Sequence, residues 1–195
     1  MAELTFNYGV MGCAKSANAL MTRWDYLSCN RNVWLIKPSI DTRDNIITDG
    51  KTQTIIKSRV GISAVADVIH TDEHITVPKD IHAIICDEAQ FLQPWQVDEL
   101  YEITKERNIP VICYGLRTDF RTKLFPGSQR LFELADRLTE LEKECGCGNR
   151  ATISARFVDG KLVTEGEQIE IGGDEKYKAL CYNCWKKLKR GNTND

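Results

Sequence analysis

Apolar segments alternate with amphipathic ones along the first two thirds of the chain. The alternation at residues 4–8 predicts a strand, and the glycine-containing turn after it leads into a helical pattern over residues 15–27. Short strands followed by helices are typical of a parallel sheet whose two faces are covered. Further buried strands are predicted at 33–36, 81–86 and 111–114, and helices at 94–108 and 128–136.

The pattern changes in two other places. Residues 39–58 are polar and contain Asp49-Gly50, which predicts an extended loop or a hairpin. Beyond residue 136 a charged segment, 140–144, precedes strand-like pieces at 152–158 and 168–171. We therefore divide the chain into a main domain, a small module and a disordered tail, at residues 1–140, 141–190 and 191–195.

Composition narrows the classes of protein. A chain of 195 residues with 42% hydrophobic content can bury one main core and carry a small added module. Its start, Met1-Ala2-Glu3, does not resemble a signal peptide, and no apolar run approaches the roughly 20 residues that span a bilayer, so we expect a cytoplasmic protein without a membrane partner. The formal charge of −2, with only a short basic run at 186–190, also argues against a nucleic-acid partner.

The turn between the first strand and the first helix has the form of a phosphate-binding loop, except that Ala14 stands where a second glycine is expected. Its amides can donate to phosphate oxygens, Lys15 adds a positive charge, and the Ser16 hydroxyl can bind magnesium. The alternative is an ordinary strand-to-helix turn. We expect a negative φ at Ala14, because a positive φ costs alanine on the order of 1 kcal/mol relative to glycine. The candidate loop consists of Gly9, Val10, Met11, Gly12, Cys13, Ala14, Lys15 and Ser16.

Two acids follow the buried run at 81–86. Asp87 and Glu88 stand at a strand end, where open α/β sheets bind ligands. One carboxylate there can hold hydrated magnesium while its neighbour accepts a proton from an attacking hydroxyl. The alternative is a solvated end of a strand.

The 8 cysteines fall into two groups. Four are scattered, at residues 13, 29, 86 and 113, and four form two close pairs near the C-terminus. Paired spacing in a cytosolic chain favours a metal over disulfides, and four thiolates around one zinc ion form a closed structural site. Free thiols or a redox pair remain the alternatives. The candidate ligands are Cys145, Cys147, Cys181 and Cys184.

An ordered set of motifs resembles the type II thymidine kinase family. The set spans nearly the whole chain, and the resemblance implies a P-loop NTPase core with a mostly parallel, RecA-like sheet at 1–140 and a zinc-ribbon or lasso lid at 141–190. The motifs are Lys37-Pro38-Ser39-Ile40-Asp41-Thr42-Arg43, Ser58-Arg59-Val60-Gly61, Asp87-Glu88-Ala89-Gln90-Phe91-Leu92, Gly115-Leu116-Arg117-Thr118-Asp119-Phe120 and Glu167-Gln168-Ile169-Glu170-Ile171-Gly172-Gly173.

The resemblance implies transfer of the ATP γ-phosphoryl group to the 5′-hydroxyl of thymidine. Glu88 would be the base that activates the hydroxyl, and Asp87 with Ser16 would serve Mg²⁺. Arg43 would reach the phosphates. The other residues implied at the nucleotide are Asp41, Thr42 and Gln90.

The same resemblance implies a nucleoside pocket in which the base stacks on Phe120 and is held largely by backbone groups of a late loop. Arg156 would help to anchor the lid. The implied pocket residues are Met11, Phe91, Leu116, Phe120, Ser154, Arg156, Gln168, Ile169, Glu170, Ile171, Gly172 and Tyr177.

Similar enzymes form homotetramers, and a triphosphate end product, dTTP, is a candidate inhibitor. Val10, Cys13-Ala14 and the Cys-x-Cys spacing of the first cysteine pair depart from the family pattern. Two other classes stay open at this point: a P-loop and zinc-ribbon ATPase acting on nucleic acid, and a nucleotide-binding regulator that has lost catalysis.

Overall fold

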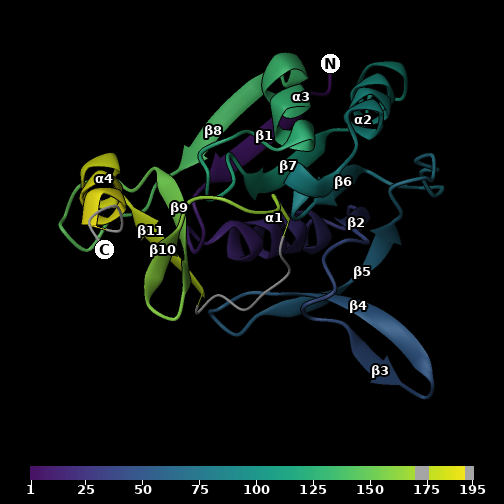
Figure 1. The fold of residues 1–195 in the computed structure, drawn as a ribbon. Coiled ribbons are helices and arrows are strands. Elements are labelled where there is room, and N and C mark those ends of the chain that lie inside the picture. The colour runs from purple at the N-terminus through teal and green to yellow at the C-terminus, as the bar shows by residue number, and fades with distance from the viewer. Residues whose placement is uncertain (170–175, 192–195) are drawn as a thin grey trace.

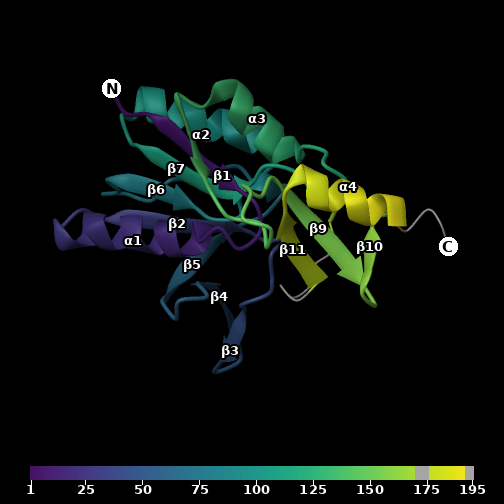
Figure 2. The same ribbon diagram turned by 90° about the vertical axis from the view of Figure 1, so that its left-hand side faces the viewer.

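A large mixed sheet forms the centre of the molecule. The computed structural model describes residues 1–169 and 176–191, and within them this sheet has eight strands in the order β3-β4-β5-β2-β6-β7-β1-β8. Helix α1 (Lys15–Ser28) covers one face, and α2 (Pro94–Glu106) and α3 (Pro126–Leu134) cover the other (Figures 1 and 2). The strands are β1 (Leu4–Gly9), β2 (Val33–Pro38), β3 (Ile46–Thr48), β4 (Lys51–Lys57), β5 (Ser63–Ile69), β6 (Ala83–Cys86), β7 (Val111–Leu116) and β8 (Arg137–Leu141).

Most neighbouring strands of the sheet are parallel. Strands β5, β2, β6, β7, β1 and β8 pair in parallel, whereas β3 and β4 form an antiparallel hairpin joined to the edge of β5. Cys86 at the end of β6 is in register with both Ile36 and Cys113, and Gly9 is in register with Leu116. The residues that follow β1, β2, β6 and β7 therefore meet at one edge of the sheet.

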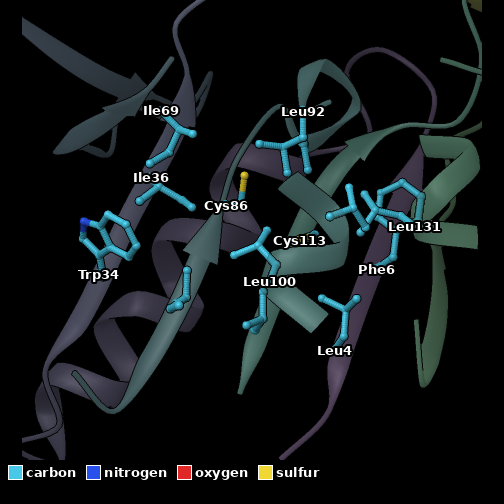
Figure 3. Close-up of a cluster of buried hydrophobic side chains, with 14 of the residues drawn as sticks. Leu4, Phe6, Trp34, Ile36, Ile69, Cys86, Leu92, Leu100, Cys113 and Leu131 are labelled. Atoms are coloured by element: carbon cyan, nitrogen blue, oxygen red, sulfur yellow. The ribbon is translucent and has the colours of Figure 1, made fainter. Parts of the chain in front are cut away.

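Alternation along β6 divides the core between the two faces. Ile84 and Cys86 belong to the buried cluster that includes Val97 and Leu100 of α2, part of which Figure 3 shows. Ile85, the residue between them, belongs to the cluster on the α1 face. Because both faces are buried, this strand is apolar throughout, as the sequence pattern predicts.

A smaller antiparallel sheet lies beyond the end of the large one (Figures 1 and 2). It contains β9 (Ile153–Val158), flanked by β10 (Lys161–Val163) and β11 (Tyr177–Leu180), and α4 (Tyr182–Gly191) follows it. Trp185 of α4 packs into a cluster with Ile153, Ala155 and Leu162. This module has its own small core.

The predicted strands of the large sheet and the helices that cover it are confirmed, and their observed ends differ from the predicted ones by a few residues at most. The polar stretch 39–58 contains the hairpin β3–β4, as predicted. Helix α2 begins at Pro94, after Gln93, whose amide donates to the side chain of Gln96 at 3.0 Å. The strand expected at 168–171 is wrong for residues 168 and 169, which lie outside any strand, while 170 and 171 fall outside the described residues.

Gly191, which we assigned to the C-terminal tail, is the last residue of α4. Residues 192–195 lie outside the described part. No helix in residues 1–169 and 176–191 combines the length and the apolar character needed to cross a membrane.

Candidate active site

The predicted phosphate loop connects β1 to α1. Its lysine is buried, and Lys15 Nζ donates to the carbonyl of Val10 at 2.9 Å, so the ammonium group is held over the loop. Gly9 is required by close packing, since a Cβ there would lie 2.5 Å from Cys13 Sγ and 2.5 Å from the Leu141 carbonyl oxygen. The sequence therefore builds the loop around a glycine and a buried cation, as its motif predicts.

Our expectation of a negative φ at Ala14 is wrong. Ala14 has φ +64° and ψ 25°, in the left-handed region. Its carbonyl accepts a hydrogen bond from the amide of Asn18 at 3.0 Å, so α1 begins directly after this left-handed residue. The chain enters the helix through the conformation that glycine adopts most easily, and alanine accepts it at a cost of about 1 kcal/mol or more.

Asp87 lies at the end of β6 and is almost completely buried. Its Oδ1 atom has no hydrogen-bond partner among the described residues. Burial, with the nearby charge of Glu88, raises the pKa of Asp87 to about 7, against the lowering effects of a hydrogen bond from Ser16 and the charge of Lys15. A buried carboxylate oxygen without a donor, next to a serine hydroxyl, fits the oxygen ligands that Mg²⁺ prefers.

Glu88 is held by an arginine and an amide. Arg43 Nη2 lies 2.6 Å from Glu88 Oε1, and Gln90 Nε2 donates to Glu88 Oε2. Gln90 in turn accepts a hydrogen bond from the amide of Leu116 at 2.9 Å. Glu88 itself has φ +53° and precedes the short helix η1 (Ala89–Phe91), so its side chain leaves the strand in a different direction from that of Asp87.

Arg43 is fixed by two carboxylates. Its Nε lies 2.7 Å from Asp41 Oδ1, and Lys37 Nζ lies 3.0 Å from Asp41 Oδ2. Burial alone would lower the pKa of Arg43, but hydrogen bonds and charges from Asp41 and Glu88 raise it. Although burial opposes ionisation of Asp41, Arg43 and Lys37 hold its pKa below the usual value. Arg43 therefore stays charged and points towards Glu88.

These groups surround one cavity of about 650 Å³. Lys15 and Glu88 both line it, so the phosphate loop and the acidic pair face the same space. Five of the nucleotide candidates do not line this cavity: Gly9, Val10, Cys13, Thr42 and Gln90. Those that do are Met11, Gly12, Ala14, Lys15, Ser16, Asp41, Arg43, Asp87 and Glu88.

The hairpin region contributes residues to this cavity for which we predicted no role. Residues 56–60 line it, and 58–60 of these belong to a motif that supports the family resemblance. Ser58 closes the turn, because its amide donates to the Ile62 carbonyl at 2.9 Å. Lys143 also reaches the loop, with Nζ 3.0 Å from the Gly12 carbonyl oxygen. Their place depends on long-range folding, which no local motif predicts.

A second, more apolar pocket adjoins the first, and Met11, Asp41, Arg43 and Glu88 line both. Phe120 is buried here, with the Arg156 guanidinium carbon 5.2 Å from the centre of its ring. The Met11 amide donates to Ser154 Oγ at 2.9 Å and so connects the phosphate loop to β9. The candidates that line the second pocket are Met11, Gln90, Phe91, Leu116, Phe120, Ser154, Gln168, Ile169 and Tyr177.

Arg156 does not line this pocket but contacts it through Phe120. Three lining residues were not among our candidates: Thr118, Asp119 and Phe125. Thr118 and Asp119 belong to the motif that ends in Phe120, whereas Phe125 precedes α3 and packs edge-on against Phe91 at 5.7 Å between ring centres. Nothing in the local sequence marks Phe125. Glu170, Ile171 and Gly172 lie outside the described residues.

The four paired cysteines converge. Their sulfur atoms all lie within 4.8 Å of one another, and Cys147 Sγ is 3.6 Å from Cys181 Sγ. Tetrahedral Zn²⁺ with bonds of about 2.3 Å would separate its sulfur ligands by about 3.8 Å, so the geometry fits one ion. Hydrogen bonds from the backbone and side chain of Asn149 lower the pKa of Cys147 to about 6, which favours the thiolate that binds metal.

A strand-to-helix loop with a buried lysine, a buried aspartate and the neighbouring glutamate surround one cavity at the edge of a mostly parallel sheet, and this arrangement defines the class: an α/β protein with a P-loop-like core. The model of the family described as "Thymidine kinase" matches residues 2–185. Thymidine kinase of Enterobacteria phage T4 is 42% identical over 97% of this chain and 98% of its own length. The thymidine kinases of Zymomonas mobilis and Legionella pneumophila (strain Lens) are each 41% identical, over 93% and 99% of this chain and 94% and 93% of their own.

The chain belongs to the thymidine kinase family. It is accordingly an ATP-dependent nucleoside kinase.

Proposed function

We propose that this enzyme transfers the γ-phosphoryl group of ATP to the 5′-hydroxyl of thymidine. The observation that carries the proposal is the position of Glu88. It lines both the phosphate cavity and the apolar pocket, and its two carboxylate oxygens are oriented by Arg43 and Gln90. A base at the junction of two pockets can take a proton from a hydroxyl in one while that hydroxyl attacks a phosphate in the other.

The residues divide the chemistry among them. The bond from the 5′-oxygen to the γ-phosphorus forms as the bond from that phosphorus to the β,γ-bridging oxygen breaks, ADP leaves, and the hydroxyl proton passes to Glu88. Lys15 and Arg43 stabilise the negative charge on the transferring group. Asp87 and Ser16 would hold Mg²⁺, which neutralises charge on the phosphate oxygens when bound.

We assign the apolar pocket to the nucleoside, with the base against Phe120. Phe120 is nearly fully buried and lies within a pocket lined by Met11, Leu116 and Tyr177, which suits an aromatic ring. Glu170, Ile171 and Gly172 remain predicted backbone contacts.

We also propose that residues 1–140 form a RecA-like kinase domain and 141–190 a zinc-bound lid. Zinc would join the segment around Cys145 to the start of α4, so the small sheet between them is closed at its base. The homotetramer, inhibition by dTTP and the cytoplasmic location remain predictions.

The test is thymidine-dependent production of ADP, measured with a panel of nucleosides. Glu88→Gln should lower kcat by about 10²-fold to 10⁴-fold, because the amide cannot accept the proton. The control is Glu102→Gln, which removes an exposed carboxylate on α2. ADP release that responds to DNA or RNA and not to thymidine would instead support a nucleic-acid-dependent ATPase. Binding of ATP with no turnover on any nucleoside would support a regulator.

A further inference from the structure

Asp119 follows β7, and its side chain is completely buried. Its carboxylate accepts hydrogen bonds from the amides of Arg121 and Lys123, both at 2.9 Å. Arg121 Nε lies 2.9 Å from Asp119 Oδ2, so a charged partner is also present. A buried carboxylate needs such compensation, and here the local turn supplies most of it.

One further donor comes from far along the chain. Gln168 Nε2 lies 3.2 Å from Asp119 Oδ2 and 3.1 Å from the Leu124 carbonyl oxygen. Arg121, which Asp119 orients, donates through Nη1 to the Gly166 carbonyl at 3.0 Å. Three hydrogen bonds therefore fasten the segment Gly166–Gln168 to the turn after β7, and two of them depend directly on Asp119 or on the arginine that it holds.

This connection lies at the nucleoside pocket. Phe120 is the next residue after Asp119, and the Arg121 guanidinium carbon is 5.8 Å from the centre of its ring. Asp119, Phe120, Gln168 and Ile169 all line the pocket. The two amide hydrogen bonds are enough to hold the turn. The additional hydrogen bond from Gln168 instead holds the late segment against the pocket.

We infer that Asp119 is a positioning residue that holds the segment Gly166–Ile169 against Phe120 and so sets the affinity for the nucleoside. The inference rests on the proposed function. Asp119 touches neither the phosphate cavity nor Glu88 in the described structure, so its effect falls on nucleoside binding and spares phosphoryl transfer.

The first test is Asp119→Asn. Asparagine keeps one oxygen that can accept from the turn amides. In place of the second oxygen it has an NH₂ group, which cannot accept the hydrogen bonds that Arg121 and Gln168 donate. We expect KM for thymidine to rise about 10-fold to 100-fold, with kcat and KM for ATP within about threefold of wild type. A rise in KM for ATP as large as that for thymidine, or an unchanged KM for thymidine in a folded variant, would overturn the inference.

The second variant, Gln168→Leu, removes the hydrogen bonds that Gln168 donates and leaves Asp119 and its turn unchanged. It tests the inference even if Asp119→Asn does not fold. It should raise KM for thymidine by about fivefold, and this effect should be smaller in the Asp119→Asn background, where only the hydrogen bond to the Leu124 carbonyl remains to be lost. Gln129→Leu is the matched control, since Gln129 is exposed on α3 and donates to Glu133.

Amide hydrogen exchange gives a readout that does not need activity. In both variants, peptides covering 164–169 should exchange faster than in wild type without ligand, while β1, β6 and β7 keep their protection. Unchanged exchange at 164–169 would overturn the inference. A wild-type enzyme that does not phosphorylate thymidine would instead refute the proposed function and leave this structural test intact.

Discussion

The two pockets that meet at Glu88 are built from different parts of the chain and by different forces. Charged and polar groups at the ends of adjacent parallel strands make the phosphate cavity, and ion pairs such as that between Arg43 and Asp41 fix them. Side chains from residue 11 to residue 177 make the nucleoside pocket, joined by hydrogen bonds such as that from Met11 to Ser154.

The difference teaches where each function is encoded. The phosphate cavity depends on short contiguous motifs, because a loop between a strand and a helix can present several donors within a few residues. The nucleoside pocket depends on contacts between segments far apart in the chain, so single changes there should affect one substrate more than the other.

The largest expected effect comes from a change in the phosphate cavity that should leave the nucleoside pocket intact. Lys15→Gln should lower kcat by about 10²-fold to 10³-fold, because a buried cation aimed at the phosphates is lost. Equilibrium binding of thymidine should change less than about threefold. Steady-state kinetics and calorimetry measure the two quantities, with the exposed Lys79→Gln as control. Loss of thymidine binding on the same scale would mean that the pockets do not act separately.

The cysteine cluster packs against the phosphate loop, and its removal tests how far the small module supports that loop. Cys145 and Cys181 belong to one buried cluster with Val10 and Cys13 of the phosphate loop. At a free Zn²⁺ concentration of about 100 times its Kd, zinc binding contributes about 2.7 kcal/mol to the free energy of unfolding. Loss of the zinc should then lower Tm by about 5–11 °C.

Cys147→Ser should therefore lower Tm by about that amount and reduce the zinc content well below one ion per chain. Thermal unfolding and metal analysis of protein purified without added zinc provide the measurements. Cys29→Ser is the control, because Cys29 is exposed and lies outside the cluster. Wild-type protein that contains much less than one zinc ion per chain would end the assignment.

A substitution of Phe120 should weaken nucleoside binding without weakening ATP binding. Phe120→Leu keeps an apolar side chain but removes the aromatic face, and stacking of a base on an aromatic ring is worth about 1–3 kcal/mol. KM for thymidine should rise about 5-fold to 100-fold, whereas KM for ATP should stay within about threefold. An equal rise in both constants would place Phe120 in the general core and not against the base.

Two parts of the phosphate cavity, the loop after β1 and the acids after β6, could be located from the sequence because each is a short contiguous motif. The apolar run at residues 81–86 predicts β6. The register of β6 with β2 and β7 places the two acids that follow it at the edge of the sheet. The converging cysteines follow from spacing in the same way.

Other features could not be predicted from local pattern. Phe125 enters the nucleoside pocket because α3 packs near η1, which is a tertiary contact with no sequence motif. The late loop is described up to Ile169 without a strand, although its alternating residues suggested one. Its position is set by side-chain hydrogen bonds to Asp119 and Leu124, which compete with strand pairing.

The smallest expected effect concerns Ala14, where our expectation from sequence fails. A left-handed alanine costs about 1–2 kcal/mol, and Ala14→Gly removes this cost. Glycine also makes the unfolded chain more flexible, which offsets about 0.4–1 kcal/mol of the gain. The net change should be a stabilisation of up to about 1.6 kcal/mol, or a rise in Tm of no more than about 6 °C.

Ala17→Gly is the matched control for Ala14→Gly. Ala17 lies inside α1, where φ is negative, so glycine there should destabilise the protein by about 1 kcal/mol. The two variants should therefore shift Tm in opposite directions when measured by thermal unfolding without ligand. If Ala14→Gly instead lowers Tm as much as Ala17→Gly does, Ala14 does not occupy the left-handed region in solution, and the phosphate loop carries no strain that a second glycine would relieve.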